Sequence, residues 1–450
     1  MKIVILGAGR RGIRLARFLV EEQNDVILLD DNPSNVAKAL TSVDCLAYEC
    51  SGTDIDQLNT FEISDADAFI ALTGSDETNL VSCGIVSSNF KIPTTIASVR
   101  NLSYTNTESF MGISHIVNPY QEVALHIWKE LDKGIYSDVI MFEHSALLLN
   151  NVYVDDSSPY QDMSLKNIRK EFDGNFLIAA ISRDEEIIVP SGDTVIRKGD
   201  TLGVIADNEA LENIFHVEET KKKRGRKICI VGGTKITDFL LHKFTERQRK
   251  NTTVIIKDPD YANEISSRYP GVLTINDNIT NEGIFSQENL ENNDVIVCIT
   301  DNDELNIISA SYAKTMGIKN AMALIIKNPD YVRMARHMGI DSLISSQDVT
   351  VDSILKYLQG KNISSRHKMF DGRLETFEFE VPQDSPLIGK KLMDINMKDK
   401  GIIGGVTNSR TKTNIIPSGT YEIKASDVLV LINLSKSNMF IQDLLSGKEV

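Results

Sequence analysis

The chain has 450 residues, a length typical of roughly three or four domains of about 100–200 residues each. Its net charge of −15, from 48 basic and 63 acidic residues, argues against a nucleic-acid partner, because phosphate binding needs a basic surface. No apolar run approaches the ~20 residues of a membrane span, and the five scattered cysteines are typical of reduced thiols in a cytosolic protein. The seven histidines show no i, i+4 pairs, so the sequence predicts no metal site.

The first 135 residues alternate short apolar strands with helices. We expect strands at residues 2–6, 26–29, 45–49, 68–72 and 94–98, and helices at about 13–22 and 78–88. Strands that alternate with helices of ten or more residues indicate β-α-β units and a parallel sheet. Residues 1–135 are therefore predicted to form a Rossmann-like, doubly wound nucleotide-binding domain.

The pattern changes after this domain and then returns. Residues 136–218 contain short β-rich runs separated by Ser, Gly and Asp turns, which predicts a small α+β domain. A basic run at 221–227 follows; one solvated linker explains it more simply than a nucleic-acid or lipid patch. We expect a second Rossmann-like domain at 226–362 and a second small α+β domain at 370–450.

An internal repeat supports this division. Met111-Gly112-Ile113 recurs as Met338-Gly339-Ile340, at an offset of 227 residues (338 − 111 = 227), and Pro190-Ser191-Gly192 recurs as Pro417-Ser418-Gly419 at the same offset. The segment Leu72–Asn79 also returns as Ile299–Asn306. This period is too long for a solenoid unit, so the sequence predicts a tandem duplication of a two-domain cassette.

The chemistry lies at the first strand-to-helix turn. Residues Gly7–Gly12 read G-x-G-x-x-G, directly after a predicted strand and before a helix, which is the context that a dinucleotide fingerprint requires. Gly7 permits the tight turn, Gly9 leaves room for the pyrophosphate, and Gly12 allows close packing of helix and strand. Asp30 ends the second strand, where a carboxylate binds the ribose hydroxyls and disfavours a 2′-phosphate, so NAD(H) is expected rather than NADP(H).

Three later loops follow strands of the same predicted sheet: Ser51–Asp54, Thr73–Asp76 and Arg100. Ligands of open α/β sheets bind outside the carboxyl ends of the strands, so we expect these loops to border the same crevice. Arg10 and Arg11 add positive charge beside the phosphates and would also suit the triphosphate of ATP. The alternative for each residue of the three loops is a turn or a helix cap, and for Asp76 and Glu77 it is a cap of the helix that begins near Thr78. The residues expected to bind the cofactor are Gly7, Ala8, Gly9, Arg10, Arg11, Gly12, Asp30, Gly52, Thr53, Thr73, Gly74 and Arg100.

The second copy has lost much of this motif. Gly232 keeps the turn, but Thr234 replaces Gly9 and Thr237 replaces Gly12, and a side chain at 234 would crowd a pyrophosphate. Lys257 and Asp258 stand near the counterpart of Asp30, and the sequence does not decide between them. We expect the second crevice to be empty or to hold a different ligand, such as a mononucleotide.

These features resemble the TrkA family, the cytosolic regulatory subunits of bacterial Trk potassium-uptake systems, which are built from tandem RCK (regulator of potassium conductance) units. The residues that carry the resemblance are Lys2–Gly9, Leu72–Asn79, the segment from Arg100 to Tyr104, and Pro190–Gly192 with its echo. The alternation of Rossmann-like and small domains covers nearly the whole chain and is more specific than any single motif.

The resemblance implies a ring of such units, expected to be a homotetramer, beneath a TrkH-like membrane K⁺ subunit. It implies gating by NAD(H) and ATP/ADP, a place on the inner face of the membrane through that partner, and no membrane insertion of its own. The alternative is an NAD-dependent oxidoreductase. Such an enzyme needs a proton-transfer group beside the nicotinamide, and the small domains offer no obvious candidate, so we expect a regulator rather than an enzyme.

Overall fold

A computed structural model of the chain describes residues 1–434 apart from a few short gaps. These gaps are residues 105–109, 134–138, 157, 185, 216–225, 282, 329, 336–337, 359–362, 371–372, 396, 398–400 and 409. Most of the basic run at 221–227 therefore lies outside the described residues. The chain divides into two compact units: Met1–Tyr136 with Lys222–Leu358, and Ser137–Lys221 with Gln359–Val450.

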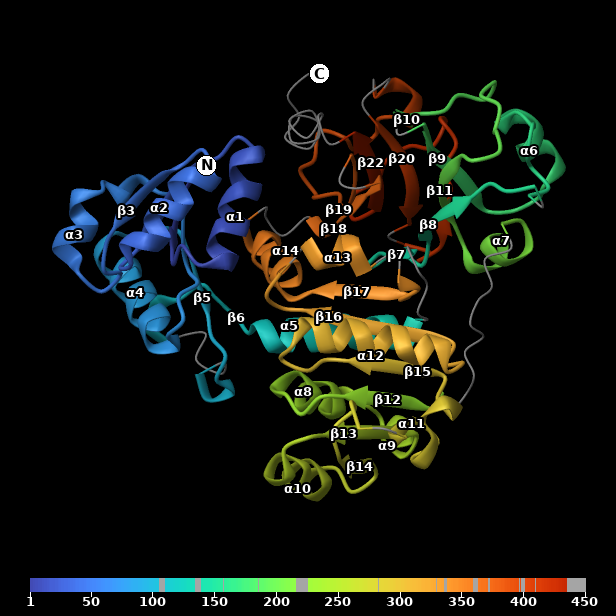
Figure 1. Cartoon of the computed structure of the whole chain (residues 1–450). Helices are drawn as coiled ribbons and strands as arrows, with labels where there is room; N and C mark the ends of the chain where they lie inside the picture. The colour runs from blue at the N-terminus through green and yellow to red at the C-terminus, as the bar shows by residue number, and fades with distance from the viewer. Residues whose placement is uncertain are drawn as a thin grey trace. The chain divides into compact units, whose positions relative to one another are not determined.

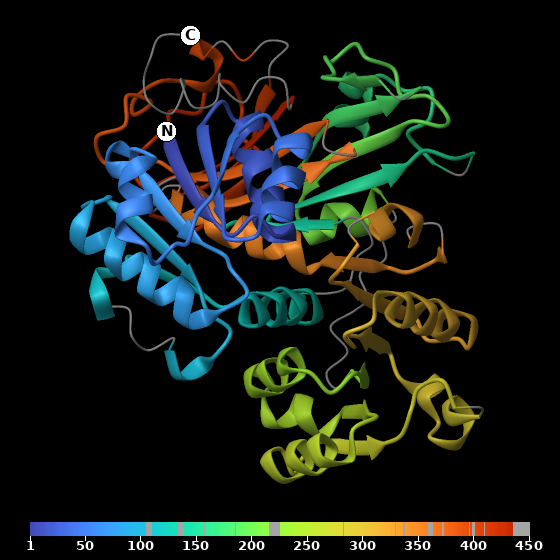
Figure 2. The ribbon, with the colours of Figure 1, turned by 60° about the vertical axis from the view of Figure 1, so that its left-hand side comes forward.

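The first parallel sheet has six strands in the order β3-β2-β1-β4-β5-β6, with helices on both faces (Figure 2). Its strands are β1 (Lys2–Leu6), β2 (Asp25–Asp30), β3 (Leu46–Glu49), β4 (Ala68–Ala71), β5 (Thr94–Ser98) and β6 (His115–Val117). Its helices are α1 (Arg10–Glu21), α2 (Pro33–Ser42), α3 (Ile55–Thr60), α4 (Asp76–Asn89) and α5 (Pro119–Lys133). The strand order reverses between β1 and β4, and in open α/β sheets ligands bind outside the carboxyl ends of the strands at such a point.

The second parallel sheet repeats this order as β14-β13-β12-β15-β16-β17. Its strands are β12 (Ile228–Val231), β13 (Thr252–Ile256), β14 (Leu273–Asn276), β15 (Val295–Cys298), β16 (Asn320–Ile325) and β17 (Ser342–Ser345). Its helices are α8 (Lys235–Lys243), α9 (Glu246–Lys250), α10 (Pro259–Arg268), α11 (Ile284–Gln287), α12 (Asp303–Thr315), α13 (Asp330–Ala335) and α14 (Ser346–Leu358). Both central strands are buried on both faces, which explains their unbroken apolar sequences.

The last helix of each copy packs into the core of the other copy. In α5, Ile127 is fully buried among side chains of the second sheet and of α8 and α10. In α14, Ile354 is fully buried among side chains of the first sheet and of α1. Figure 1 shows α5, in teal, beside α8, and α14, in orange, beside α1. The two Rossmann-like domains thus complete each other's hydrophobic cores by exchanging helices.

An ion pair joins α1 of the first copy to the exchanged helix α14 of the second copy. Arg14 of α1 donates from its Nε to Oδ1 of Asp348 in α14, over 2.8 Å. A second polar contact lies at α5, where Ser342 of β17 donates to Glu130 over 2.6 Å. The first contact links the helix that begins at the glycine turn directly to the second copy.

Each small domain contains a five-stranded antiparallel sheet. The first sheet has the order β10-β9-β11-β8-β7, from β7 (Val139–Met141), β8 (Leu148–Tyr153), β9 (Phe176–Arg183), β10 (Glu186–Ile188) and β11 (Thr201–Ala206), with helices α6 (Leu165–Glu171) and α7 (Asn208–Asn213). The second has the order β18-β19-β22-β20-β21, from β18 (Ile363–Met369), β19 (Leu374–Glu380), β20 (Gly401–Thr407), β21 (Asn414–Ile415) and β22 (Val428–Leu434).

The two small domains share one core and are joined by hydrogen bonds to a buried carboxylate. Ile205 of the first and Ile432 of the second belong to one buried apolar cluster. The fully buried carboxylate of Glu378 accepts hydrogen bonds from the backbone N–H groups of Glu143, His144 and Ser145, over 2.7–2.9 Å. Three donors offset the cost of burying this charge. Because the donors belong to the first small domain and the carboxylate to the second, these hydrogen bonds fix the pairing of the two domains.

The predicted fold class is confirmed: two Rossmann-like parallel sheets, each followed by a small antiparallel α+β domain. In the first parallel sheet, the boundaries of the expected strands differ from the observed ones by one residue at most, and the larger differences are in the helices. The first helix begins at Arg10 rather than near Ile13, and the helix expected at 78–88 spans Asp76–Asn89. Within the described residues, no helix has the length and apolar character needed to cross a membrane.

Candidate nucleotide-binding site

The first glycine turn is built by backbone contacts that only glycine permits. Gly7 has φ +105°, and its N–H donates to the carbonyl of Leu29 over 2.7 Å, which ties the turn to β2. A Cβ on Gly12 would clash with the carbonyl oxygen of Gly7. Gly9 differs from both, because a Cβ at this position would meet nothing within 4 Å. Gly7 and Gly12 therefore serve the fold, whereas Gly9 leaves open space at the turn.

The amino end of α1 faces this space without a protein cap. Gly9 is the N-cap residue and offers no side-chain hydrogen bond, and the first turn of α1 carries no acidic residue. By contrast, Asn32 caps α2 and Ser75 caps α4 through their side chains. The unpaired N–H groups and the helix dipole at α1 suit a phosphate.

Asp30 braces the turn as well as facing it. Its Oδ2 accepts from the N–H of Ala8 over 2.7 Å, and its Oδ1 accepts from the N–H of Asn32 and the amide of Asn35, over 2.9 and 3.0 Å. Each carboxylate oxygen can accept two hydrogen bonds. These three contacts therefore leave one acceptor position on Oδ2 unused at the end of β2.

Three arginines gather positive charge at the crevice. Arg10 is exposed, and Arg11 is half-buried beside it. Burial lowers the pKa of the Arg11 guanidinium; the phenol of Tyr120 opposes this shift, and the charges of Arg100 and Arg10 add to it. Guanidinium groups that repel one another at a helix amino end are stabilised by an anion, so this arrangement favours a polyphosphate ligand.

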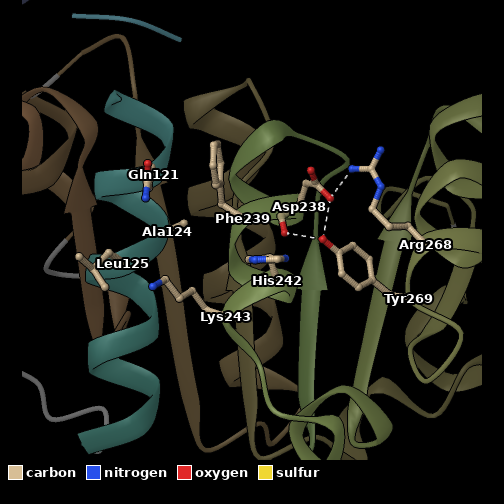
Figure 3. Close-up of a pocket in the computed structure, with 9 residues that line it drawn as sticks. All are labelled: Gln121, Ala124, Leu125, Asp238, Phe239, His242, Lys243, Arg268 and Tyr269. Carbon is tan, nitrogen blue, oxygen red and sulfur yellow. Dashed lines mark hydrogen bonds and ion pairs between the residues drawn. The ribbon is translucent and has the colours of Figure 1, made fainter. Parts of the chain in front are cut away.

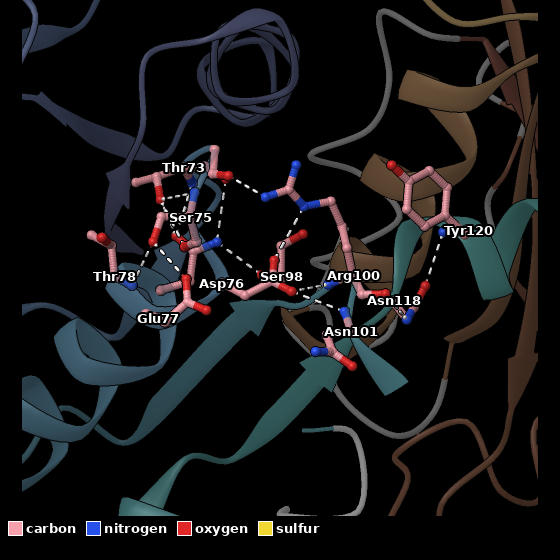
Figure 4. A network of polar contacts seen from close by, with 12 residues as sticks. Thr73, Ser75, Asp76, Glu77, Thr78, Ser98, Arg100, Asn101, Asn118 and Tyr120 are labelled. Atoms are coloured by element: carbon pink, nitrogen blue, oxygen red, sulfur yellow. Dashed lines mark hydrogen bonds and ion pairs between the residues drawn. The ribbon is translucent and has the colours of Figure 1, made fainter. Parts of the chain in front are cut away.

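Asp76 positions Arg100 (Figure 4). Asp76 is 7% exposed, and its carboxylate accepts from Nε of Arg100 over 3.1 Å and from the backbone N–H groups of Arg100 and Asn101, each over 2.9 Å. Arg100 also donates from Nη2 to the carbonyl of Gly74. The alternative that Asp76 only caps its helix does not hold: Ser75 accepts from the N–H of Thr78, and the Asp76 carboxylate holds the loop after β5.

Asn79 holds the loop after β4 and was missed by the sequence analysis. It is 1% exposed, and its Oδ1 accepts from the N–H and the hydroxyl of Thr73 over 2.9 and 2.6 Å. Its amide donates to the carbonyl of Ser98 over 2.8 Å, which joins β4 to β5. The same contacts recur in the second copy between Asn306 and Thr300. The echo of Asn79 at the repeat offset was the signal that could have identified it.

The remaining predicted residues separate into open and packed positions. Gly74 is exposed and unobstructed, and Thr53 is exposed. Gly52 lies against the side chains of Leu6 and Ser82, so its lack of a side chain serves packing rather than ligand access. Thr73 is engaged by Asn79, which leaves its backbone beside the glycine turn.

The second glycine turn keeps its backbone shape but not its open space. Gly232 has φ +128°, and its N–H donates to the carbonyl of Ile255 over 3.0 Å. The hydroxyl of Thr237 donates to the carbonyl of Gly232 over 2.6 Å, where Gly12 makes a close backbone contact in the first copy. The hydroxyl of Thr234 lies 3.4 Å from the carbonyl oxygen of Ile299. The side chain of Thr234 therefore occupies the position that Gly9 leaves open.

The counterpart of Asp30 is neither Lys257 nor Asp258, so both residues named from the sequence were wrong. Leu6 pairs with Leu29 in the first sheet, and Val231 pairs with Ile255 in the second, which places Ile256 at the position of Asp30. Ile256 is 1% exposed and offers no acceptor to a ribose. The repeat offset misled because it is 227 residues in the later segments but 226 between Asp30 and Ile256 (256 − 30 = 226).

Within the described residues, no group of three or more His, Cys, Asp or Glu side chains could hold a metal ion.

The arrangement that the two copies share can be compared with known proteins. The TrkA-N domain model matches residues 3–119 and 228–346, and the TrkA-C domain model matches residues 151–216 and 376–437.

Relatives and solved structures match the chain over almost its full length. The Trk system potassium uptake protein TrkA of Halomonas elongata is 27% identical over 445 residues, which are 97% of this chain and 96% of that protein. The GsuK RCK domain gives a TM-score of 0.55 at 16% identity, covering 99% of this chain and 95% of that chain. The GsuK channel bound to NAD gives 0.54 at 17% identity, covering 99% and 79%. Because the domain models match more than half of the sequence in the order of the four observed sheets, the chain belongs to the TrkA family, with TrkA-N and TrkA-C domains in alternation.

Proposed function

We propose that this chain is a nucleotide-sensing regulatory subunit of a Trk-type potassium-uptake system. In this proposal NAD(H), ATP or ADP binds at the first glycine turn and alters K⁺ flux through a TrkH-like membrane partner. The single observation that carries the ligand assignment is the uncapped amino end of α1 at Gly9, which faces open space and has Arg10, Arg11 and Arg100 nearby.

The ligand contacts follow from this geometry. The pyrophosphate lies over Gly9 and the first turn of α1, and Asp30 accepts from a ribose hydroxyl. Ala8, Thr53, Thr73 and Gly74 line the edges of the crevice. The GsuK channel, which shares the fold, is described with bound NAD, and this supports a dinucleotide as one of the ligands.

A ligand shifts a partner's gate only through different affinities for two conformations. Helix α1 begins at the glycine turn and pairs through Arg14 with Asp348 of α14, a helix of the second copy. Any displacement of α1 by a bound polyphosphate therefore acts on the contact between the two copies. We propose that this contact differs between the two conformations and carries the effect of the ligand from one copy to the other.

We propose that identical chains associate through the outer helices of the two parallel sheets. Val81 of α4 is 39% exposed, and its echo Ile308 of α12 is 61% exposed, with Tyr312 one turn further at 48%. Met111 and its echo Met338 are also exposed, at 40% and 38%. Apolar groups at equivalent positions of both copies would be covered in a ring of identical chains, for which we propose a homotetramer. The ring would lie in the cytoplasm, against the membrane through its partner and without insertion of its own.

The test is uptake of Rb⁺ into vesicles that carry the membrane partner, with and without this chain and each nucleotide. We expect a nucleotide-dependent change in uptake that requires the chain and that the Gly9→Val variant does not support. Uptake that ignores both the chain and the nucleotide would reject the regulatory role. Consumption of the reduced nicotinamide by the purified chain in the presence of a candidate substrate would instead favour an NAD-dependent oxidoreductase.

A further inference from the structure

The two contacts between exchanged helices are built differently. On one side, Arg14 of α1 and Asp348 of α14 form an ion pair of 2.8 Å. At the equivalent positions on the other side stand Phe239 of α8 and Gln121 of α5, as the shared register of the sheets and helices fixes. The ion pair has no equivalent there, and a cavity opens beside these two residues instead.

This cavity has a volume of about 370 Å³ and lies over α8, between α5 and the end of α10 (Figure 3). Ala124 and Leu125 of α5 and Phe239 of α8 form its apolar wall, and Figure 3 shows His242 and Lys243 on the face of α8 between that wall and Tyr269. Ligand sites in proteins are concave, mostly apolar and about 300–1,000 Å³ in volume, with a few polar groups that fix orientation. The cavity has this size and this composition, and it includes no residue of either glycine turn.

One end of the cavity carries a polar network that the fold does not require. Tyr269 donates from its hydroxyl to Oδ1 of Asp238 over 2.8 Å, and Arg268 pairs with the same carboxylate over 2.7 Å. The equivalent positions in the first copy are Ile13, Ser42 and Val43, in a helix pair of the same architecture. The network is thus specific to the side of the molecule that has the cavity.

The charges in the cavity are unbalanced toward the positive. In the described part of the chain, the side chains of His242 and Lys243 have no hydrogen-bonding or ion-pair partner. On α14 the positions equivalent to Gln121 and Leu125 are Asp348 and Asp352, so the exchanged helix has lost both carboxylates on this side. Both side chains are exposed where they line the cavity, so a ligand with an apolar body and an anionic group would match the apolar wall and these two basic groups.

We propose that this cavity is a second ligand site, distinct from the nucleotide crevice, for a small organic anion. The apolar body of the ligand lies on Phe239, Ala124 and Leu125, and its anionic group pairs with Lys243 and His242. The ligand bridges α5 and α8, and it therefore takes the place that the Arg14–Asp348 ion pair has on the other side.

The probe is 8-anilinonaphthalene-1-sulfonate, with N-phenyl-1-naphthylamine as the same ring system without the sulfonate. Both are titrated into the full chain in the presence of saturating NAD⁺, which occupies the nucleotide crevice. Trp128 is the only tryptophan of the chain and lies on α5 one turn beyond Ala124 and Leu125, so energy transfer from Trp128 reports binding at this place. We expect one sulfonate probe per chain, quenching of Trp128, and at least roughly 10-fold weaker binding of the neutral probe.

Two variants separate this site from unspecific apolar binding. Lys243→Gln should weaken the sulfonate probe roughly 10-fold and leave the neutral probe unchanged, whereas Lys250→Gln, an exposed lysine of α9, should change neither. Gln121→Asp introduces the carboxylate of the other side at an exposed position, so the fold is retained and the sulfonate probe should be repelled. Equal binding of the sulfonate probe to wild type and Lys243→Gln, weaker probe binding with saturating NAD⁺ than without it, or probe binding without quenching of Trp128 would each overturn the proposal.

Discussion

The hydroxyl of Tyr261 donates a hydrogen bond to the carbonyl oxygen of Thr234 over 3.0 Å, across the second glycine turn. Burial raises the pKa of Tyr261 to about 12, so the hydroxyl stays protonated and remains a donor at neutral pH. The ring packs so closely on Gly233 that an added Cβ there would lie 2.9 Å from it. Tyr261 thus covers the edge of the turn that Asp30 braces in the first copy.

Stoichiometry should reflect this closure. Thr234 lies in the second turn, and Tyr261 and Ile256 pack against this turn. We therefore expect one dinucleotide per chain, bound at the first turn. Calorimetric titration with NADH measures the number directly, and the Gly9→Val variant should reduce it to none. Two NADH per wild-type chain would show that the second turn opens to a dinucleotide despite these side chains.

Substitution of Gly9 should affect nucleotide binding, whereas substitution of Gly12 should affect stability. Gly9→Val should abolish dinucleotide binding with an unchanged melting temperature, because its side chain enters space that is open in the fold. Gly12→Ala should lower stability by about 1–3 kcal/mol, because its Cβ meets the backbone of Gly7. Thermal unfolding and NADH titration of the two variants test this pair, and unchanged NADH affinity in Gly9→Val would contradict the site assignment.

Asp30 should determine the choice of dinucleotide. We expect NADP(H) to bind at least ~10-fold more weakly than NAD(H), a difference above ~1.4 kcal/mol, because a 2′-phosphate would lie beside the carboxylate. Asp30→Asn should bring the two affinities closer together. Asp31→Asn, which neutralises the exposed neighbouring carboxylate, is the matched control and should leave the ratio unchanged. Equal affinities in the wild type would mean that Asp30 does not face the ribose.

Arg100 should act on a triphosphate more than on a dinucleotide. An ATP γ-phosphate extends further than the pyrophosphate of NADH, and a charge-assisted hydrogen bond is worth about 1.5–3 kcal/mol. Arg100→Ala should therefore weaken the effect of ATP on Rb⁺ uptake by at least roughly 10-fold, and NADH binding less. Lys327→Ala, at the equivalent position of the second copy, is expected to have neither effect. Parallel losses for ATP and NADH would assign Arg100 to the shared phosphates instead.

The helix exchange predicts that each copy is destabilised from a distance in sequence. Ile354→Ala removes a fully buried side chain from the core of the first copy and should cost about 2–5 kcal/mol. Hydrogen exchange should then rise in β1 and α1 more than in β12 and α8. Ile127→Ala is the reciprocal variant, and it should raise exchange in β12 and α8. Protection lost only within the copy that carries each substitution would contradict the exchange.

The sequence by itself determined the elements and their order. The apolar run before Gly7, the glycine spacing and the 227-residue echo are local or one-dimensional features, and each predicts a structure without knowledge of long-range contacts. They were sufficient for two Rossmann-like domains, two small domains and a nucleotide turn with its glycines and Arg10 and Arg11. The sites of ligand contact assigned to these residues remain predictions for the measurements above.

Tertiary structure decided which groups meet across the chain. Asp76 contacts Arg100 because β4 and β5 are neighbours in the sheet, and Ile256 takes the place of Asp30 because register, rather than residue spacing, aligns the strands. The exchange of α5 and α14 left no sequence signal, since an apolar helix face is the same whichever core it enters. Only the packing of both cores against both helices shows that one copy completes the other.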